Sequence, residues 1–148
     1  MITSGVVLEC LRYNQNMDEI PDTTGKICEA LLKQEFWHEG AKIEDISVLF
    51  LKVRDGAWHR FFFDCGPLFW KIVEAPDVWN TTPADSFHYP QTEIGSELGI
   101  IGQLIESAEL HEATGFEEVR LQFENGTLLV LHHLYPQDTT TLLIEQRR

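Results

Sequence analysis

The sequence predicts an α+β protein in which a mostly antiparallel sheet of about six strands is covered by two main helices. Two observations support this prediction. Asp55-Gly56 and Asn125-Gly126 each lie between β-rich runs, and both dipeptides favour the positive φ angles of a two-residue hairpin turn. In two other segments the apolar residues recur at helical spacing. The expected element order is β-α-β-β-loop-α-β-β-β.

The composition is that of an ordinary soluble globular protein. Hydrophobic residues make up 43% of the 148 positions and charged residues 24%, and a chain of this length can bury a substantial core. We therefore expect a single domain over residues 1–148. No apolar run has the length of a membrane span. The amino-terminal MITSGVVLECLRY lacks the basic start of a signal peptide, which favours a cytoplasmic location.

The first half of the chain is expected to contain a strand, a helix and a hairpin. Residues 5–13 have the pattern of a strand, and the apolar residues that follow recur at helical spacing. Asp22 or Thr23 can cap this helix, which runs to about Glu39. In the hairpin over residues 44–66 both faces are apolar away from the turn, as suits a central element covered on both sides.

The length of each hairpin loop also predicts its register. A two-residue loop in the central hairpin places Phe50 opposite Phe61. A two-residue loop in the carboxyl-terminal hairpin places Glu118 opposite His133 as an exposed pair, and leaves His132 half-buried at the end of the sheet. The expected core residues are Leu49, Phe50, Phe61, Phe62, Phe63, Leu121, Phe123 and Val130.

The second half is expected to contain a long loop, a helix and a meander. Residues 67–73 fit either a short helix or an extended segment, and the irregular stretch 75–92 carries several aromatic residues. A second helix is predicted from Glu93 or Glu97 to Leu110. The chain then ends in a three-stranded antiparallel meander.

Three glycines fall together on one flank of this second helix. Gly95, Gly99 and Gly102 recur at i, i+4 and i+7, and three glycines cost a helix about 2–3 kcal/mol relative to alanine. Close packing against another backbone would offset that cost. This leaves open a homodimer through the glycine face.

No pattern in the sequence matches a known catalytic or metal-binding motif. His111-Glu112 begins like the zinc motif HExxH, but Gly115 stands where the second histidine belongs. Cys65 shares a face of the central hairpin with two phenylalanines, so its thiol is expected to be buried and inert. We therefore expect no metal, no cofactor and no catalytic residue, and the sequence leans against an enzyme.

Charge is the strongest functional indication. The formal net charge is −13, and ten acidic residues but no Lys or Arg lie between Lys71 and Arg120. Such charge opposes binding to nucleic acid or to an anionic membrane. A run of this kind is typical either of a solvated surface that keeps the protein soluble or of a surface for a cationic partner.

The preferred hypothesis is a non-enzymatic, inhibitor-type binding protein that docks a basic protein partner through its acidic middle region. Complementary charge would speed association, and aromatic anchors would supply affinity. The glutamates are expected to form one patch where the second helix meets the meander. The predicted partner-binding residues are Trp79, Tyr89, Glu106, Glu109, Glu112, Glu117 and Glu118.

The alternative hypothesis is a small enzyme or ligand-binding domain. Its aromatic-lined pocket would lie between the sheet and the 75–92 loop. A deep pocket with convergent polar groups would favour this alternative, whereas a shallow acidic surface with exposed aromatic residues would favour the binding protein. The expected lining residues are Trp58, Trp70, Trp79, Phe87 and His88.

Overall fold

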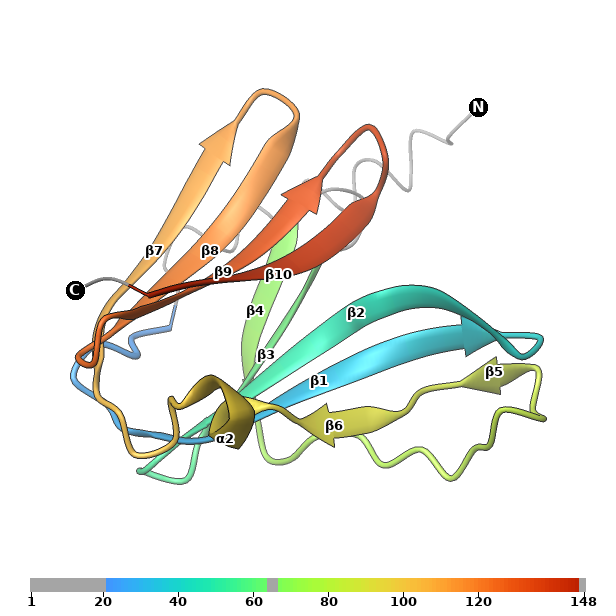
Figure 1. Cartoon of the computed structure of the whole chain (residues 1–148), viewed down its shortest axis with the longest axis horizontal. Coiled ribbons are helices and arrows are strands. Elements are labelled where there is room, and N and C mark those ends of the chain that lie inside the picture. The colour runs from blue at the N-terminus through green and yellow to red at the C-terminus, as the bar shows by residue number, and fades with distance from the viewer. Residues whose placement is uncertain (1–20, 64–66, 147–148) are drawn as a thin grey trace.

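Two antiparallel β-sheets contain almost all regular structure in the computed structural model, which describes residues 21–63 and 67–146 (Figure 1). The strands are β1 (Cys28–His38), β2 (Ala41–Val53), β3 (Trp58–Phe63), β4 (Leu68–Val73), β5 (Phe87–His88), β6 (Gln91–Glu93), β7 (Ile105–Ala113), β8 (Phe116–Phe123), β9 (Thr127–Leu134) and β10 (Thr139–Gln146), and the helix α2 spans Gly95–Leu98.

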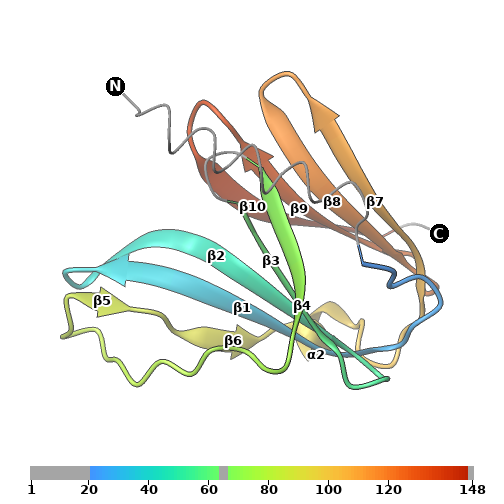
Figure 2. The same cartoon turned by 180° about the vertical axis from the view of Figure 1, so that it is seen from behind.

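The first sheet has the spatial order β4-β3-β2-β1-β5, and β6 also pairs with β1. The second sheet has the order β10-β9-β8-β7. The first sheet is strongly bent: β3 and β4 run beside the second sheet, whereas the far ends of β1 and β2 swing away together with β5 (Figures 1 and 2). The predicted strand over residues 5–13 lies outside the described residues, as do Cys10 and Cys65.

The mostly antiparallel sheet is confirmed, but the α+β class is wrong. Within the described ranges no helix reaches seven residues. The segment predicted as the first helix forms β1, in which Cys28 and Leu31 are buried and Leu32 is half-buried. β1 is an interior strand with β2 on one side and β5 and β6 on the other. Because such a strand can bury residues on both faces, its apolar pattern lacks the two-residue period that identifies a strand.

The second predicted helix, over residues 93–110, is also wrong. It ends after the four residues of α2, because Gly99 adopts a φ of 73° and closes the helix in the left-handed conformation. Gly102 has a φ of 82° in the following loop. The three glycines therefore do not share a helix face, and a homodimer through such a face has no surface to use. Only Gly95 is closely packed, since a Cβ there would lie 2.5 Å from Cδ1 of Ile101.

The remaining segments agree better with the sequence. Residues 68–73 form β4, so the extended alternative is correct there and the short helix is not. The carboxyl-terminal meander is confirmed as β8, β9 and β10. It gains a fourth strand, β7, from the segment that was expected to be helical.

Both predicted hairpins are confirmed, but each register is shifted by one residue. Phe50 lies opposite Arg60 instead of Phe61, and Glu118 lies opposite His132 instead of His133. Each loop contains three residues and not two, because a type I turn followed by a left-handed glycine inserts one more residue. The shift therefore changes which residues of the two paired strands share a face of the sheet.

The two loops share one geometry. The N–H of Gly56 donates to the carbonyl of Val53 at 2.9 Å, and the N–H of Gly126 donates to the carbonyl of Phe123 at 3.0 Å. The φ angles of these glycines are 94° and 92°. In each loop the preceding Asp or Asn side chain accepts the N–H of the residue two positions on, at 3.0 and 3.1 Å.

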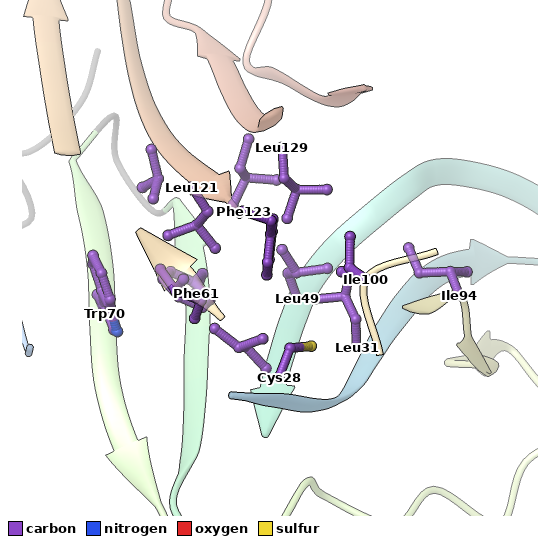
Figure 3. Packing of buried hydrophobic residues seen from close by; sticks show 14 of the residues in the cluster. Cys28, Leu31, Leu49, Phe61, Trp70, Ile94, Ile100, Leu121, Phe123 and Leu129 are labelled. Carbon is purple, nitrogen blue, oxygen red and sulfur yellow. The ribbon is translucent and has the colours of Figure 1, made fainter. Parts of the chain in front are cut away.

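The core lies where the bent half of the first sheet packs against the second sheet. Figure 3 shows Phe123 of β8 pointing toward Leu49 of β2, with Leu31 and Ile100 close by. Of the predicted core residues, all are buried except Phe62 and Phe63, which are half-buried. Further members of the core were not among the expected core residues: Ile46, Leu68, Trp70, Ile100 and Ile105.

The observed register predicts unequal costs for two neighbouring phenylalanines. Phe61 is 1% exposed, so Phe61→Ala should lower the free energy of unfolding by about 3–5 kcal/mol. Phe62, on the opposite face, is only half-buried and should cost clearly less. Urea unfolding of both variants measures the difference. Equal costs would show that the register predicted from a two-residue loop is the better description.

Candidate functional site

The predicted acidic residues do not form one patch. Glu106, Glu109 and Glu112 are exposed, but they lie along β7, the edge strand of the second sheet, and not at the end of a helix. β7 and the loop that carries Trp79 and Tyr89 stand at opposite ends of the molecule (Figures 1 and 2). The two halves of the predicted partner-binding set therefore cannot contact one small ligand together.

Glu118 lies on the outer face of the second sheet and is engaged by two neighbours. Its Oε2 is 2.8 Å from Nδ1 of His132, and its Oε1 accepts from Nη1 of Arg120 at 3.4 Å. Glu109 has a similar contact, 2.8 Å from Nε2 of His111. Both carboxylates are therefore engaged by side chains of their own sheet.

Glu117 points the opposite way and is buried between the sheets. It accepts the hydroxyl proton of Tyr135 at 2.6 Å and the N–H of Leu68, from the first sheet, at 3.3 Å. Burial raises the pKa of Glu117, and the Glu112 carboxylate adds to this, while the two hydrogen bonds oppose the rise. Glu117 therefore links the two sheets and is closed to a docking partner.

His133 is the cross-strand neighbour of Glu117 and is also buried. Its ring stacks on Phe63 of the first sheet, with centroids 4.6 Å apart, and its Nδ1 lies 2.9 Å from Oγ1 of Thr140. Nε2 is 3.2 Å from Oδ1 of Asp138, whose side chain is exposed. Burial lowers the pKa of His133. Together with Glu117 it forms a polar seam between the sheets, and we assign it a structural role.

A continuous row of aromatic rings lies at the far end of β1, and we call it the aromatic strip. The ring centroids of Trp79 and Tyr89 are 4.5 Å apart, and those of Tyr89 and Phe36 are 5.6 Å apart. The ring centroids of Phe36 and Phe87 are 6.2 Å apart, and the centroid of Phe87 is 5.0 Å from that of the His38 imidazole. Trp79 is 45% exposed and Phe87 is 50% exposed.

Pairing with β1 and side-chain hydrogen bonds fix the strip in place. β5 and β6 pair with β1, so Phe87 and Tyr89 are held beside Phe36. Nε2 of Gln91 donates to the carbonyl of Asp77 at 2.7 Å and to Oε1 of Gln34 at 2.9 Å. These contacts tie the 75–92 loop to the sheet. The strip is thus a preformed surface.

Carboxylates without cationic partners lie close in sequence to the residues of the strip. Residues 36–40 and 74–93 include no Lys or Arg. Within the part of the chain that the structure describes, Glu39, Asp77 and Asp85 are exposed and form no ion pair with any cation. By contrast, Lys33 and Lys42 on the same half of the sheet both contact Asp45 at 3.0 Å.

The residues of the alternative pocket do not come together. Trp70 is buried in the core, where its Nε1–H donates to Nδ1 of His59 at 3.0 Å. Trp58 lies on β3 beneath the ammonium group of Lys52. Phe87 and His88 are in β5, with His88 packed edge-on against Trp37. The sequence indicated Trp79, Tyr89 and Phe87 but not Phe36, which was expected on the apolar face of the first predicted helix.

Other reactive groups give no indication of chemistry. Burial raises the pKa of the Cys28 thiol to about 12, so it is protonated and unreactive. The described residues include no group of three or more His, Cys, Asp or Glu placed to hold a metal ion. Among the described residues there is also no helix that is long and apolar enough to cross a membrane.

The fold and the strip define a protein of two bent, packed antiparallel sheets with one exposed aromatic and acidic end. Comparison of the chain with protein-family models, with curated proteins and with solved structures found no match.

The seam predicts a pH-dependent effect of Glu117→Gln. Because the pKa of Glu117 is raised in the folded chain, the folded state holds this proton more tightly, and its contribution to stability falls as pH rises above the ordinary carboxyl value. Glutamine cannot ionise. The free energy of unfolding of the variant relative to the parent should therefore increase between about pH 5 and pH 8.

Urea unfolding across this pH range provides the measurement. Glu118→Gln is the matched control, since it removes one carboxylate from the same strand on the outer face, where the side chain is 13% exposed and held by His132 and Arg120. A difference between Glu117→Gln and the parent that does not change with pH would contradict the buried seam.

Proposed function

We propose that this protein is a non-enzymatic binding protein that docks a basic protein partner through the aromatic strip and the carboxylates around it. The observation that supports this most directly is the exposure of Trp79 and Phe87 within a fixed row of stacked rings. Large aromatic side chains left in water on a rigid surface are typical of binding sites. Tryptophan and tyrosine are also the residues that most often dominate binding energy.

The charges near the strip favour a cationic partner. Asp77 lies beside the Trp79 end, and Asp85 and Glu39 flank the Phe87 end, where the N–H of Glu39 donates to the carbonyl of Ser86 at 3.0 Å. Unpaired carboxylates attract cations, and the faces of aromatic rings attract them as well. None of these carboxylates has to leave a cationic partner on binding, although Oδ2 of Asp85 accepts the N–H of Thr82 at 2.6 Å.

The exposed acids of β7 contribute to this function at long range. Glu106, Glu109 and Glu112 are too far from the strip to contact the same segment of a partner. They add to the overall charge of −13, which accelerates the approach of a basic molecule at low ionic strength. Glu117 is buried in the seam and takes no part.

The binding role can be tested with a fluorescent decalysine peptide as the probe. Replacing both Trp79 and Phe87 with Ala should weaken its binding about tenfold or more, because the two exposed anchors are lost while the sheet remains. Val78→Ala is the matched control, since Val78 is 82% exposed in the same loop but belongs to no ring contact. Fluorescence anisotropy measures the dissociation constants. Equal affinity of the double variant and the parent would refute the strip as the docking surface.

The long-range role of β7 predicts a different kinetic signature. Reversing Glu106, Glu109 and Glu112 to Lys together should slow association of the same peptide at low salt and flatten the salt dependence of the rate. The dissociation rate should change little, because these residues do not touch the bound peptide. Stopped-flow mixing at low and high salt measures both rates. If the acids serve solubility only, the association rate will stay the same.

A further inference from the structure

We infer that the aromatic strip recognises arginine side chains in preference to lysine, an inference that rests on the proposed binding of a basic partner. The strip offers two kinds of group to a cation: ring faces and carboxylates. At one end Trp79 provides the ring and Asp77, two residues before it, the carboxylate. At the other end Phe87 provides the ring and Asp85, two residues before it, the carboxylate, one oxygen of which accepts the N–H of Thr82. A ligand must satisfy both kinds of group without keeping a full hydration shell.

A guanidinium group fits this requirement better than an ammonium group. It is planar, so it can lie on a ring face while its edge N–H groups bind a carboxylate with two parallel hydrogen bonds. It is also more weakly hydrated, so contact with the ring costs less water. A lysine ammonium is compact and strongly hydrated, and it tends to remain at the carboxylate without contacting the ring closely.

The molecule contains an internal comparison of the two cations. The guanidinium carbon of Arg60 lies 4.3 Å from the ring centroid of Phe62 on β3. The ammonium nitrogen of Lys52 lies 5.9 Å from the ring centroid of Trp58 on the same sheet. The arginine therefore packs on the smaller ring at the shorter distance, in agreement with the preference inferred for the strip.

The two ends of the strip indicate two arginine seats. Tyr89 and Phe36 stand between the exposed rings and are half-buried. A single arginine cannot contact Trp79 and Phe87 at once, because two intervening rings separate them. The strip therefore fits an extended segment that carries two arginines separated by a few residues.

The test compares two fluorescent ten-residue peptides of equal charge, one alternating arginine with glycine and the other lysine with glycine. The parent protein should bind the arginine peptide about tenfold more tightly. Trp79→Ala and Phe87→Ala should each reduce this ratio, and the double variant should bring it close to one. Val78→Ala should leave the ratio unchanged.

The outcomes separate this inference from the proposed function. If the parent binds both peptides equally and the double variant loses both, the strip docks basic segments and the arginine preference is refuted. If the double variant keeps the parent's ratio, the preference arises elsewhere and the inference is again refuted. If the parent binds neither peptide, the proposed function fails and the inference fails with it. Circular dichroism of each variant verifies that the sheets are intact.

Discussion

The left-handed conformations of Gly56 and Gly126 are the constraint on which the rest of the structure depends. Each glycine closes a three-residue loop and sets the register of the hairpin that follows it. Because successive side chains of a strand point to opposite faces, one residue of shift exchanges the inner and outer sets. These loops thereby direct Phe61 and Leu121 into the core and place Glu117 between the sheets. A side chain at either glycine would strain the loop, since L-residues rarely adopt these φ angles.

The polar seam shows how the two sheets are positioned relative to each other. Hydrophobic contacts hold the sheets together but specify their relative placement weakly. The hydrogen bond from Leu68 to Glu117 and the stacking of Phe63 on His133 join particular positions of the two sheets. A buried carboxylate stabilises little in itself, since burial raises its pKa, but its donors must occupy fixed places. The seam therefore contributes alignment more than free energy.

The sequence was informative where a local rule decides the structure. The hairpin dipeptides, the meander and most of the core follow from turn chemistry and apolar runs, so those predictions hold. The registers did not follow, because Asp-Gly and Asn-Gly fit loops of two and three residues equally well. The helix predictions failed because the short turns at Glu39-Gly40 and Thr114-Gly115, which join β1 to β2 and β7 to β8 as hairpins, were not recognised. Cys28 and Leu31 are three residues apart in an interior strand, which imitates helical spacing.

The candidate site was predicted only in part, for a similar reason. Trp79, Tyr89 and Phe87 were conspicuous as aromatic residues in an irregular loop. Phe36 belonged to a predicted helix, so nothing in the sequence placed it between Tyr89 and Phe87. The glutamates were grouped by their proximity in sequence, whereas Glu117 and Glu118 are neighbours that face opposite sides of a sheet. Because consecutive residues of a strand alternate between faces, the predicted meander alone was enough to separate them.

The adjacent pairs Glu117-Glu118 and His132-His133 have a consequence for folding. A β8–β9 hairpin formed one residue out of register would still place a glutamate beside a histidine at this level of the sheet. The glutamate–histidine row therefore does not distinguish the correct hairpin from a slipped one. Leu121 does, because a slip would move its side chain to the outer face. A slipped hairpin would lose the apolar contacts of the correct register. Packing against the first sheet therefore favours the correct register, because that register presents Leu121 to the core.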